Sequence, residues 1–276
     1  MKTLFLLFFL SVAFTVSAGE RNDIFSCYSA VKLEPSRPDY SGRELVIIID
    51  QTVKVPLDLK KSLWQQVIRY VQAGDHIVLY QFSALLQDNY MKRIFDGKLE
   101  VPLTDKNIRN HIGMESLKSL DRCLSQQKQF FEKTIGNKMA ESFAEKGNNI
   151  AKSEILDSLK RIGEDLRSES ATTRVILLIS DMLENSEFSS FYSNNSIRLL
   201  DPEKEMIRVK KQQLIADFLG ASIYISGAGL IDTDSPGVYR SGKIIQKLEG
   251  FWRQYFDASQ AKLVSFGVPE LTVNIK

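Results

Sequence analysis

The sequence predicts one α/β domain in which a mostly parallel central sheet has helices on both faces and one antiparallel edge strand. Continuous apolar runs at 45–49 and 175–179 are typical of strands that are buried on both faces of a sheet. Such strands alternate with helical patterns along the chain, as they do in three-layer sheets of the Rossmann type. No Pro-, Gly- or Ser-rich linker divides residues 43–276, so we expect a single domain there.

The first half of this domain follows from apolar spacing and turn residues. Pro56 opens a helical pattern with apolar residues at three- and four-residue steps, and Gly74 stops it. The pair Asp96-Gly97 predicts a turn after an edge strand. The expected elements are a strand over 45–49, a helix over 56–71, a strand over 76–82, and an edge strand or hairpin over 90–95.

The second half contains a helical insertion around 105–150, which is polar and is expected to break near Gly136 and at 147–149. Trp252, Tyr255 and Phe256 fall at helical spacing, which favours a place in the core. The other expected elements are a helix over 150–166, a strand over 175–179, a helix over 203–219, a strand over 222–225, a helix over 242–256 and a strand over 262–266.

The first residues read as a targeting segment. Lys2 precedes an apolar run over 4–14 that is too short to span a bilayer, and small side chains lead up to Ala18. This pattern predicts a signal peptide over 1–18 that is cut after Ala18, followed by an N-terminal arm over 19–42. We therefore expect a periplasmic or secreted protein with no integral membrane span.

Composition narrows the function classes. The chain has 36 Lys and Arg against 34 Asp and Glu, and this balance argues against a nucleic-acid partner. Its two cysteines are too few for a disulfide scaffold or a cysteine-built zinc site. In an oxidising compartment we expect Cys27 and Cys123 to form a disulfide, the alternative being two buried thiols.

Two acidic residues follow apolar strands. Asp50 ends the first strand, and Asp181 comes directly after the strand over 175–179. Ligands of open α/β sheets bind beyond the carboxyl ends of the strands, so these carboxylates are expected in one cleft. Because they repel each other, they need a cation or a shared proton. The simpler alternative is that each acts only as a turn or helix-cap residue.

The order of elements resembles the von Willebrand factor type A fold, as in integrin inserted domains. Asp50 and Thr52 match the start of that family's Asp-x-Ser-x-Ser loop, Ser153 matches a later Thr, and Ser180-Asp181 resembles its Thr-Asp loop. The resemblance implies that Asp50, Thr52, Ser153 and Asp181 hold a divalent cation, Mg²⁺ or Mn²⁺. In the family, such a cation takes a carboxylate from a protein partner.

Lys54 departs from this adhesion motif, because it stands where the family has its second Ser. Its ammonium group is able to neutralise the carboxylates directly, which predicts a binding site without metal that includes Lys54. Ser153 has a second reading as well, since it could simply cap the helix that follows. The metal-binding and metal-free alternatives both remain open at this point.

Together with export, the resemblance implies a protein-binding module for adhesion or assembly. We expect it to dock a protein partner of the envelope or extracellular space at the carboxyl edge of the sheet, within an envelope or a secretion- or conjugation-type assembly. The alternative is a phosphatase resembling the haloacid dehalogenases, with Asp50 as nucleophile, Ser83 as the second-motif hydroxyl and Asp181 as an Mg²⁺ ligand. Thr52 stands where that family has its general acid, so we expect no enzyme.

Overall fold

The computed structural model describes residues 21–83, 91–144, 153–193, 196–231 and 241–276. The expected signal peptide over 1–18 lies outside these ranges. Asn194, the acceptor of an Asn-Asn-Ser glycosylation pattern, lies outside them too. Within the described ranges, no helix combines the length and the apolar character that crossing a membrane requires.

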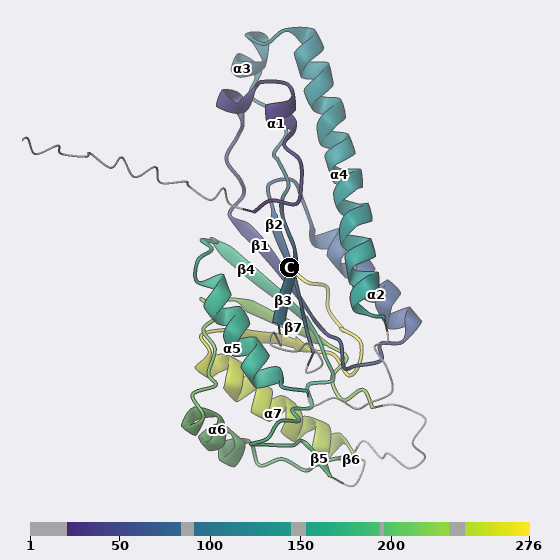
Figure 1. Ribbon diagram of the computed structural model, residues 1–276, viewed down its shortest axis with the longest axis vertical. Coiled ribbons are helices and arrows are strands. Elements are labelled where there is room, and N and C mark those ends of the chain that lie inside the picture. The colour runs from purple at the N-terminus through teal and green to yellow at the C-terminus, as the bar shows by residue number, and fades with distance from the viewer. Residues whose placement is uncertain (1–20, 84–90, 145–152, 194–195, 232–240) are drawn as a thin grey trace, which may run out of the picture.

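Six strands form one sheet in the order β3-β2-β1-β4-β7-β8 (Figure 1). All neighbours pair in parallel except β2 and β3, so the sheet is mostly parallel with one antiparallel edge strand, as predicted. The strands are β1 (Arg43–Asp50), β2 (His76–Phe82), β3 (Met91–Lys98), β4 (Thr173–Ile179), β7 (Ser222–Ser226) and β8 (Lys262–Phe266). The strand order reverses direction between β1 and β4, which places a topological switch point at their carboxyl ends.

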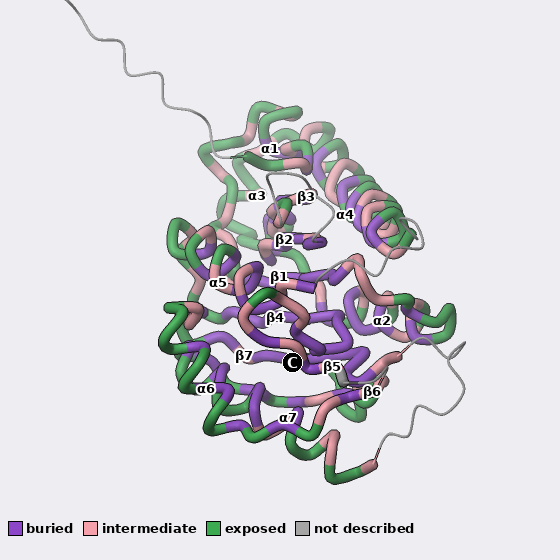
Figure 2. The backbone as a smooth tube through the Cα atoms, turned by 60° about the horizontal axis from the view of Figure 1, so that its bottom comes forward, coloured by how far each residue is buried: buried purple, intermediate pink, exposed green. Residues whose placement is uncertain are grey.

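Helices cover both faces of this sheet (Figures 1 and 2). Leu45 and Ile47 of β1 pack on the face that α2 and α4 cover, whereas Val46 and Ile48 pack on the face that α5, α6 and α7 cover. This alternation explains why the strand is apolar at every position from Leu45 to Ile49. The helices are α1 (Cys27–Ala30), α2 (Leu57–Tyr70), α3 (Lys106–Asn110), α4 (Met114–Ser142), α5 (Ile155–Leu166), α6 (Pro202–Lys211) and α7 (Gly242–Ala258).

The predicted turn at Asp96-Gly97 is wrong, because β3 continues through both residues to Lys98. Asp96 is buried, and its carboxylate pairs with His76 of β2 at 2.8 Å. A side chain at Gly97 would collide with Ile24, since a Cβ there would lie 2.6 Å from Ile24 Cδ1. Both residues that suggested a turn therefore serve tertiary contacts within a strand.

Two helix boundaries also differ from the prediction. Helix α4 runs unbroken through Gly136, and a Cβ at this position would lie only 3.3 Å from Trp64 Cη2 of α2, so the glycine permits a close approach of the two helices. Helix α6 ends at Lys211, although the apolar pattern extends to residue 219. Gln213 adopts a positive φ of 55°, which turns the chain out of the helix. Phe218 is then buried, and its main-chain N–H donates to Ser259 at the end of α7.

The N-terminal arm is fixed to the body at two places. Asp23 exchanges hydrogen bonds with Asp96 of β3, and further along Cys27 and Cys123 form the predicted disulfide. Cys27 begins the short helix α1, where an irregular stretch was expected. Together with α3 and the start of α4, this helix forms the upper end of the molecule in Figure 1. The disulfide closes a long loop, a restraint that typically stabilises a protein by about 2–4 kcal/mol.

Candidate functional site

The candidate site lies at the switch point and is built around the carboxylate of Asp50 at the end of β1. One carboxylate oxygen accepts hydrogen bonds from the main-chain N–H and the hydroxyl of Thr52, at 2.9 and 2.6 Å. The other accepts from the hydroxyls of Ser180 at 2.8 Å and Ser153 at 3.3 Å. Asp50 is only 1% exposed, so its contacts are almost entirely with other protein groups.

Ser153 reaches Asp50 because the loop after β4 holds its backbone. Asn185 N–H donates to the Ser153 carbonyl at 2.9 Å, and the two residues form an isolated β-bridge. The hydroxyls of Ser153 and Thr52 lie 3.3 Å apart. Helix α5 starts after Glu154, and its first turn is capped by Glu184, whose carboxylate accepts from the Leu156 main-chain N–H at 3.0 Å. The Ser153 hydroxyl donates to Asp50 instead, so it belongs to the site.

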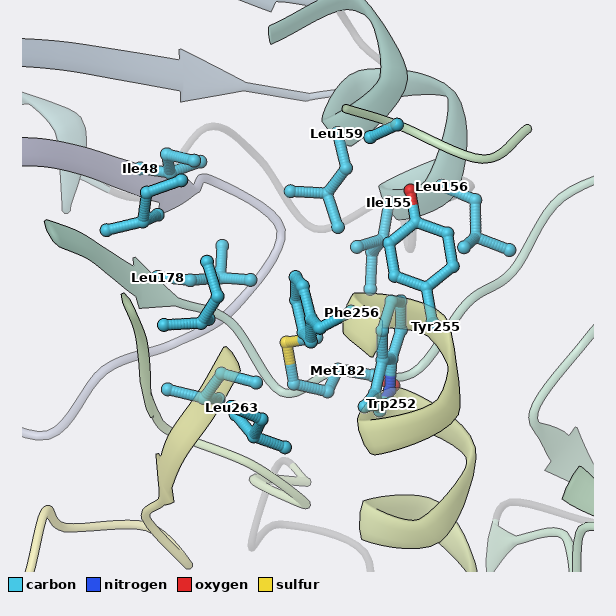
Figure 3. Packing of buried hydrophobic residues seen from close by; sticks show 14 of the residues in the cluster. Ile48, Ile155, Leu156, Leu159, Leu178, Met182, Trp252, Tyr255, Phe256 and Leu263 are labelled. Atoms are coloured by element: carbon cyan, nitrogen blue, oxygen red, sulfur yellow. The ribbon is translucent and has the colours of Figure 1, made fainter. Parts of the chain in front are cut away.

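Asp181 lies beside this cluster but satisfies its oxygens elsewhere. One oxygen accepts from the Leu183 main-chain N–H at 2.8 Å, and the other accepts from the Tyr192 hydroxyl at 2.9 Å. The following residue, Met182, has a positive φ of 62°, and its carbonyl accepts from the indole of Trp252 at 2.9 Å. Figure 3 shows Met182 next to Trp252 and Phe256 in the core. Asp181 is therefore both a turn residue, as the simpler alternative held, and a neighbour of Asp50.

The electrostatics follow from burying two carboxylates together. Burial, followed by the negative charge of Asp50, raises the pKa of Asp181 to about 8. Burial also raises the pKa of Asp50, although its hydrogen bonds from Thr52, Ser180 and Ser153 act in the opposite direction. The two groups repel each other, and the pair is expected to keep a proton at neutral pH.

Replacing Asp181 with Asn is expected to flatten the pH dependence of stability between about pH 4 and pH 8. The pKa of Asp181 is about 8 in the folded chain against 3.8 for an ordinary Asp, so the folded state binds more protons in this window. The free energy of unfolding of the original protein therefore falls as pH rises, by up to about 1.4 kcal/mol per pH unit. Urea unfolding at several pH values in EDTA measures this slope.

The matched control for this variant is Asp58→Asn, because Asp58 is an exposed Asp in the first turn of α2. It should leave the pH profile unchanged. Parallel profiles for the original protein and Asp181→Asn would show that Asp181 does not titrate in this window.

Sequence reasoning missed two residues of the site. Ser180 was named only as part of the loop motif, yet its hydroxyl binds Asp50 and also accepts from the Met182 main-chain N–H at 3.0 Å. Its position between an apolar strand and Asp181 was the sequence feature that could have identified Ser180 as a residue of the site. Tyr192 belongs to a small hairpin of β5 (Tyr192–Ser193) and β6 (Ser196–Ile197), and no local pattern relates it to Asp181.

The oxygen groups of the cluster fit a hard cation in part. Asp50, Thr52 and Ser153 offer a carboxylate and two hydroxyls at mutual distances of 2.6–3.3 Å, close to the spacing of about 3 Å between neighbouring ligands of Mg²⁺. These three residues would hold such an ion and would give a partner carboxylate a positive charge to bind. In Asp181, both oxygens already accept hydrogen bonds. Lys54 is exposed on the loop after Thr52, and whether it neutralises the pair stays a prediction.

The phosphatase alternative also stays a prediction, although the site has few of the features that such an enzyme needs. Ser83 is buried just after β2, and Asp50 is buried with each oxygen bound by two donors. A nucleophilic carboxylate needs an oxygen that the substrate can reach. Thr52 donates its hydroxyl to Asp50 and has no carboxyl group with which to protonate a leaving group.

Comparisons with known proteins assign no family. No model of a protein family matches the chain, and no curated protein matches it. Among solved structures, 31 chains are similar. One is the crystal structure of an aerotolerance-related membrane protein from Bacteroides fragilis NCTC 9343 with multiple mutations to serines. It is 14% identical over 80% of this chain and 91% of that chain, with a TM-score of 0.35. A similarity at this level supports no inference about function.

Proposed function

We propose that this protein is an exported protein-binding module of the von Willebrand factor type A class. It docks a protein partner at the carboxyl edge of its sheet, as part of an envelope or a secretion- or conjugation-type assembly. The observation that supports this most directly is the cluster of Asp50, Thr52 and Ser153, joined at the switch point of a sheet whose order is β3-β2-β1-β4-β7-β8. The disulfide agrees with an oxidising compartment.

The burial of the two acids assigns them a positioning role. Asp50 and Asp181 are 1% and 6% exposed, whereas Lys54 is exposed and Thr52 half-buried. The partner therefore contacts the loop over 51–54, and Asp50 holds this loop in place through Thr52. Because the hydroxyls and N–H groups already satisfy both carboxylates, we propose that docking needs no metal ion. Adding Mg²⁺ should then change the melting temperature little, and a shift of several degrees that Asp50→Ala abolishes would contradict this.

Site-specific crosslinking in the native envelope tests the docking edge. A photoreactive residue in place of Lys54 should give a crosslinked product with one partner protein, which mass spectrometry identifies. The same residue in place of Lys118, which is exposed on α4, serves as the control and should not give that product. Equal products from both positions, or none from position 54, would refute docking at this edge.

Removing the carboxylate that holds the loop should weaken the complex. Asp50→Ala is expected to lower recovery of the partner at least about tenfold, which corresponds to about 1.4 kcal/mol. Asp58→Ala, a change of the same residue type on the exposed start of α2, should leave recovery unchanged. Far-UV circular dichroism confirms that both variants are folded. Unchanged recovery with folded Asp50→Ala would contradict the proposed role of Asp50.

We propose no catalytic activity for this site. The test is hydrolysis of a generic phosphate ester in the presence of Mg²⁺. Activity that Asp50→Asn abolishes would establish the phosphatase alternative and overturn the purely binding role.

A further inference from the structure

A second polar cluster lies at the opposite edge of the sheet, where the parallel strands begin. Glu44 of β1 lies between His76 of β2 and Arg174 of β4, and is in register with both. Asp96 of β3 reaches His76, and Glu169, which follows α5, completes the group. The docking edge uses none of these residues.

Three of these side chains present metal-ligating atoms to one point. A nitrogen of His76 and one carboxylate oxygen each of Glu44 and Glu169 all lie within 4.8 Å of one another. His76 Nδ1 and Glu44 Oε1 are 3.0 Å apart. Two ligands of the same zinc ion lie about 3–3.5 Å apart, because each is bound at about 2.0–2.2 Å. The first pair therefore already has the spacing of metal ligands, and the ligand atom of Glu169 lies within 4.8 Å of both.

Each of the three side chains is also held by a neighbouring charged residue. His76 Nε2 contacts Asp96 Oδ1 at 2.8 Å, and Glu169 Oε1 accepts from Arg93 at 2.9 Å. Glu44 Oε2 accepts from Arg174. Metal sites in proteins show the same arrangement, in which the second nitrogen of a ligating His bonds to a carboxylate and the ligating carboxylates are themselves hydrogen-bonded.

One ligand atom lacks a hydrogen bond. Glu44 is 1% exposed, and although its Oε1 is ion-paired with His76, it accepts no hydrogen bond among the described residues. The same three side chains line a cavity of about 290 Å³, which leaves room for water or a small ligand. A buried carboxylate oxygen that faces a cavity without a donor is a site that a cation stabilises.

The charges of the cluster are also unbalanced. Ion pairs join the guanidinium groups of Arg93 and Arg174 to four carboxylates, those of Glu44, Asp96, Asp165 and Glu169. With a neutral imidazole these groups have four negative and two positive charges. Lys98 and Arg43 also line the cavity, and Arg43 is paired with Asp75, so that one negative charge remains in excess. The excess favours a bound cation or a proton on His76.

We propose that Glu44, His76 and Glu169 bind a divalent transition-metal ion, with zinc as the representative case, whose remaining coordination positions face the cavity. The imidazole nitrogen selects such an ion over Mg²⁺ and Ca²⁺, which prefer all-oxygen ligands. Asp96, Arg174 and Arg93 are positioning residues, since each acts on the metal through one ligand.

The competing state has a proton in place of the metal. Burial alone would lower the pKa of His76, but the carboxylates of Asp96 and Glu44, which lie 2.8 and 3.0 Å from its two ring nitrogens, raise it to about 9. In that state His76 is an imidazolium bridging two carboxylates, and a metal ion has to displace this proton.

Calorimetric titration of the EDTA-treated full chain with Zn²⁺ separates the two states. We expect one ion to bind per chain, and Co²⁺ in the same site to give a visible absorption spectrum. His76→Gln and Glu169→Gln should each weaken binding at least about tenfold, and Asp96→Asn about 10–100-fold through the orientation of His76. Mg²⁺ should not compete with Zn²⁺.

The matched control is His111→Gln, because His111 is the other of the two histidines and is exposed. It should bind Zn²⁺ like the original protein, as should Asp50→Ala, which separates this site from the docking edge. The absence of stoichiometric binding, or equal binding by His76→Gln, would overturn the proposal and leave His76 as a structural imidazolium. If His76→Gln does not fold, the Zn²⁺ titration of Glu169→Gln tests the proposal instead, because Glu169 is only half-buried. Unchanged binding by this variant would overturn the proposal.

Discussion

Trp252→Ala is expected to lower the free energy of unfolding by about 3–5 kcal/mol. The side chain of Trp252 in α7 is fully buried. The ring centroids of Phe251 and Tyr255 lie 5.0 and 5.4 Å from that of Trp252. Truncation opens a cavity in the larger half of the core, which cannot collapse because neighbouring rings pack against the sheet (Figure 3). It also removes the donor to the Met182 carbonyl, at the residue next to Asp181.

Chemical denaturation measures this loss. Trp252→Phe separates the contribution of the cavity from that of the lost hydrogen bond. Phe keeps much of the ring but leaves the Met182 carbonyl without its donor, which typically costs about 1–3 kcal/mol. The control is Ile207→Ala, a large apolar residue that is 67% exposed on α6, and it should stay within about 0.5 kcal/mol of the original protein. A loss below about 1 kcal/mol for Trp252→Ala would show that this core repacks.

The second large effect is expected for Arg174→Met, at about 3–5 kcal/mol. Arg174 and Glu44 form an ion pair whose side chains are 3% and 1% exposed. Removing the guanidinium leaves the buried carboxylate of Glu44 with only His76 as a partner. It also removes the donor to the carbonyls of Leu166 and Glu169 at the end of α5.

Denaturant unfolding in EDTA gives this loss without any contribution from a bound metal. Arg208→Met is the control, because Arg208 is 55% exposed and the buried Glu205 keeps its contact with Arg198 at 3.0 Å, so we expect a loss of only about 0–1 kcal/mol. In the double variant Glu44→Gln/Arg174→Met the loss should be smaller than the sum of the single losses. If Arg174→Met and Arg208→Met lowered the free energy of unfolding equally, water would have to solvate the Glu44 carboxylate in the Arg174 variant.

Much of the fold could be predicted because strand and helix patterns are local. The strands β2 and β8 have the predicted bounds, and Trp252, Tyr255 and Phe256 are in the core as expected. Among the boundaries that differ are those of α5, which starts at Ile155, and of α6 and β3, where long-range contacts compete with the local pattern. The apolar residues after Lys211 continue a helical spacing, yet the backbone leaves the helix so that Phe218 can bond to Ser259.

The candidate site was predicted in part, for a similar reason. Because parallel strands end at one edge of the sheet, the sequence predicts that Asp50 and Asp181 lie together. It did not predict how far both are buried, nor that the Tyr192 hydroxyl satisfies one oxygen of Asp181. Burial depends on the loops that close over the edge, and no local residue pattern encodes their packing.

By itself, the sequence determined the alternating strands and helices, the α/β class and the acidic residues at the ends of β1 and β4, because each follows from residues close together in the chain. Only the tertiary structure decided that Glu44, His76 and Glu169 meet at one cavity, and that Asp50 collects its hydroxyl donors from three loops. These residues are far apart in the chain, and only the packing of strands into a sheet, with helices over its faces, removes them from water together.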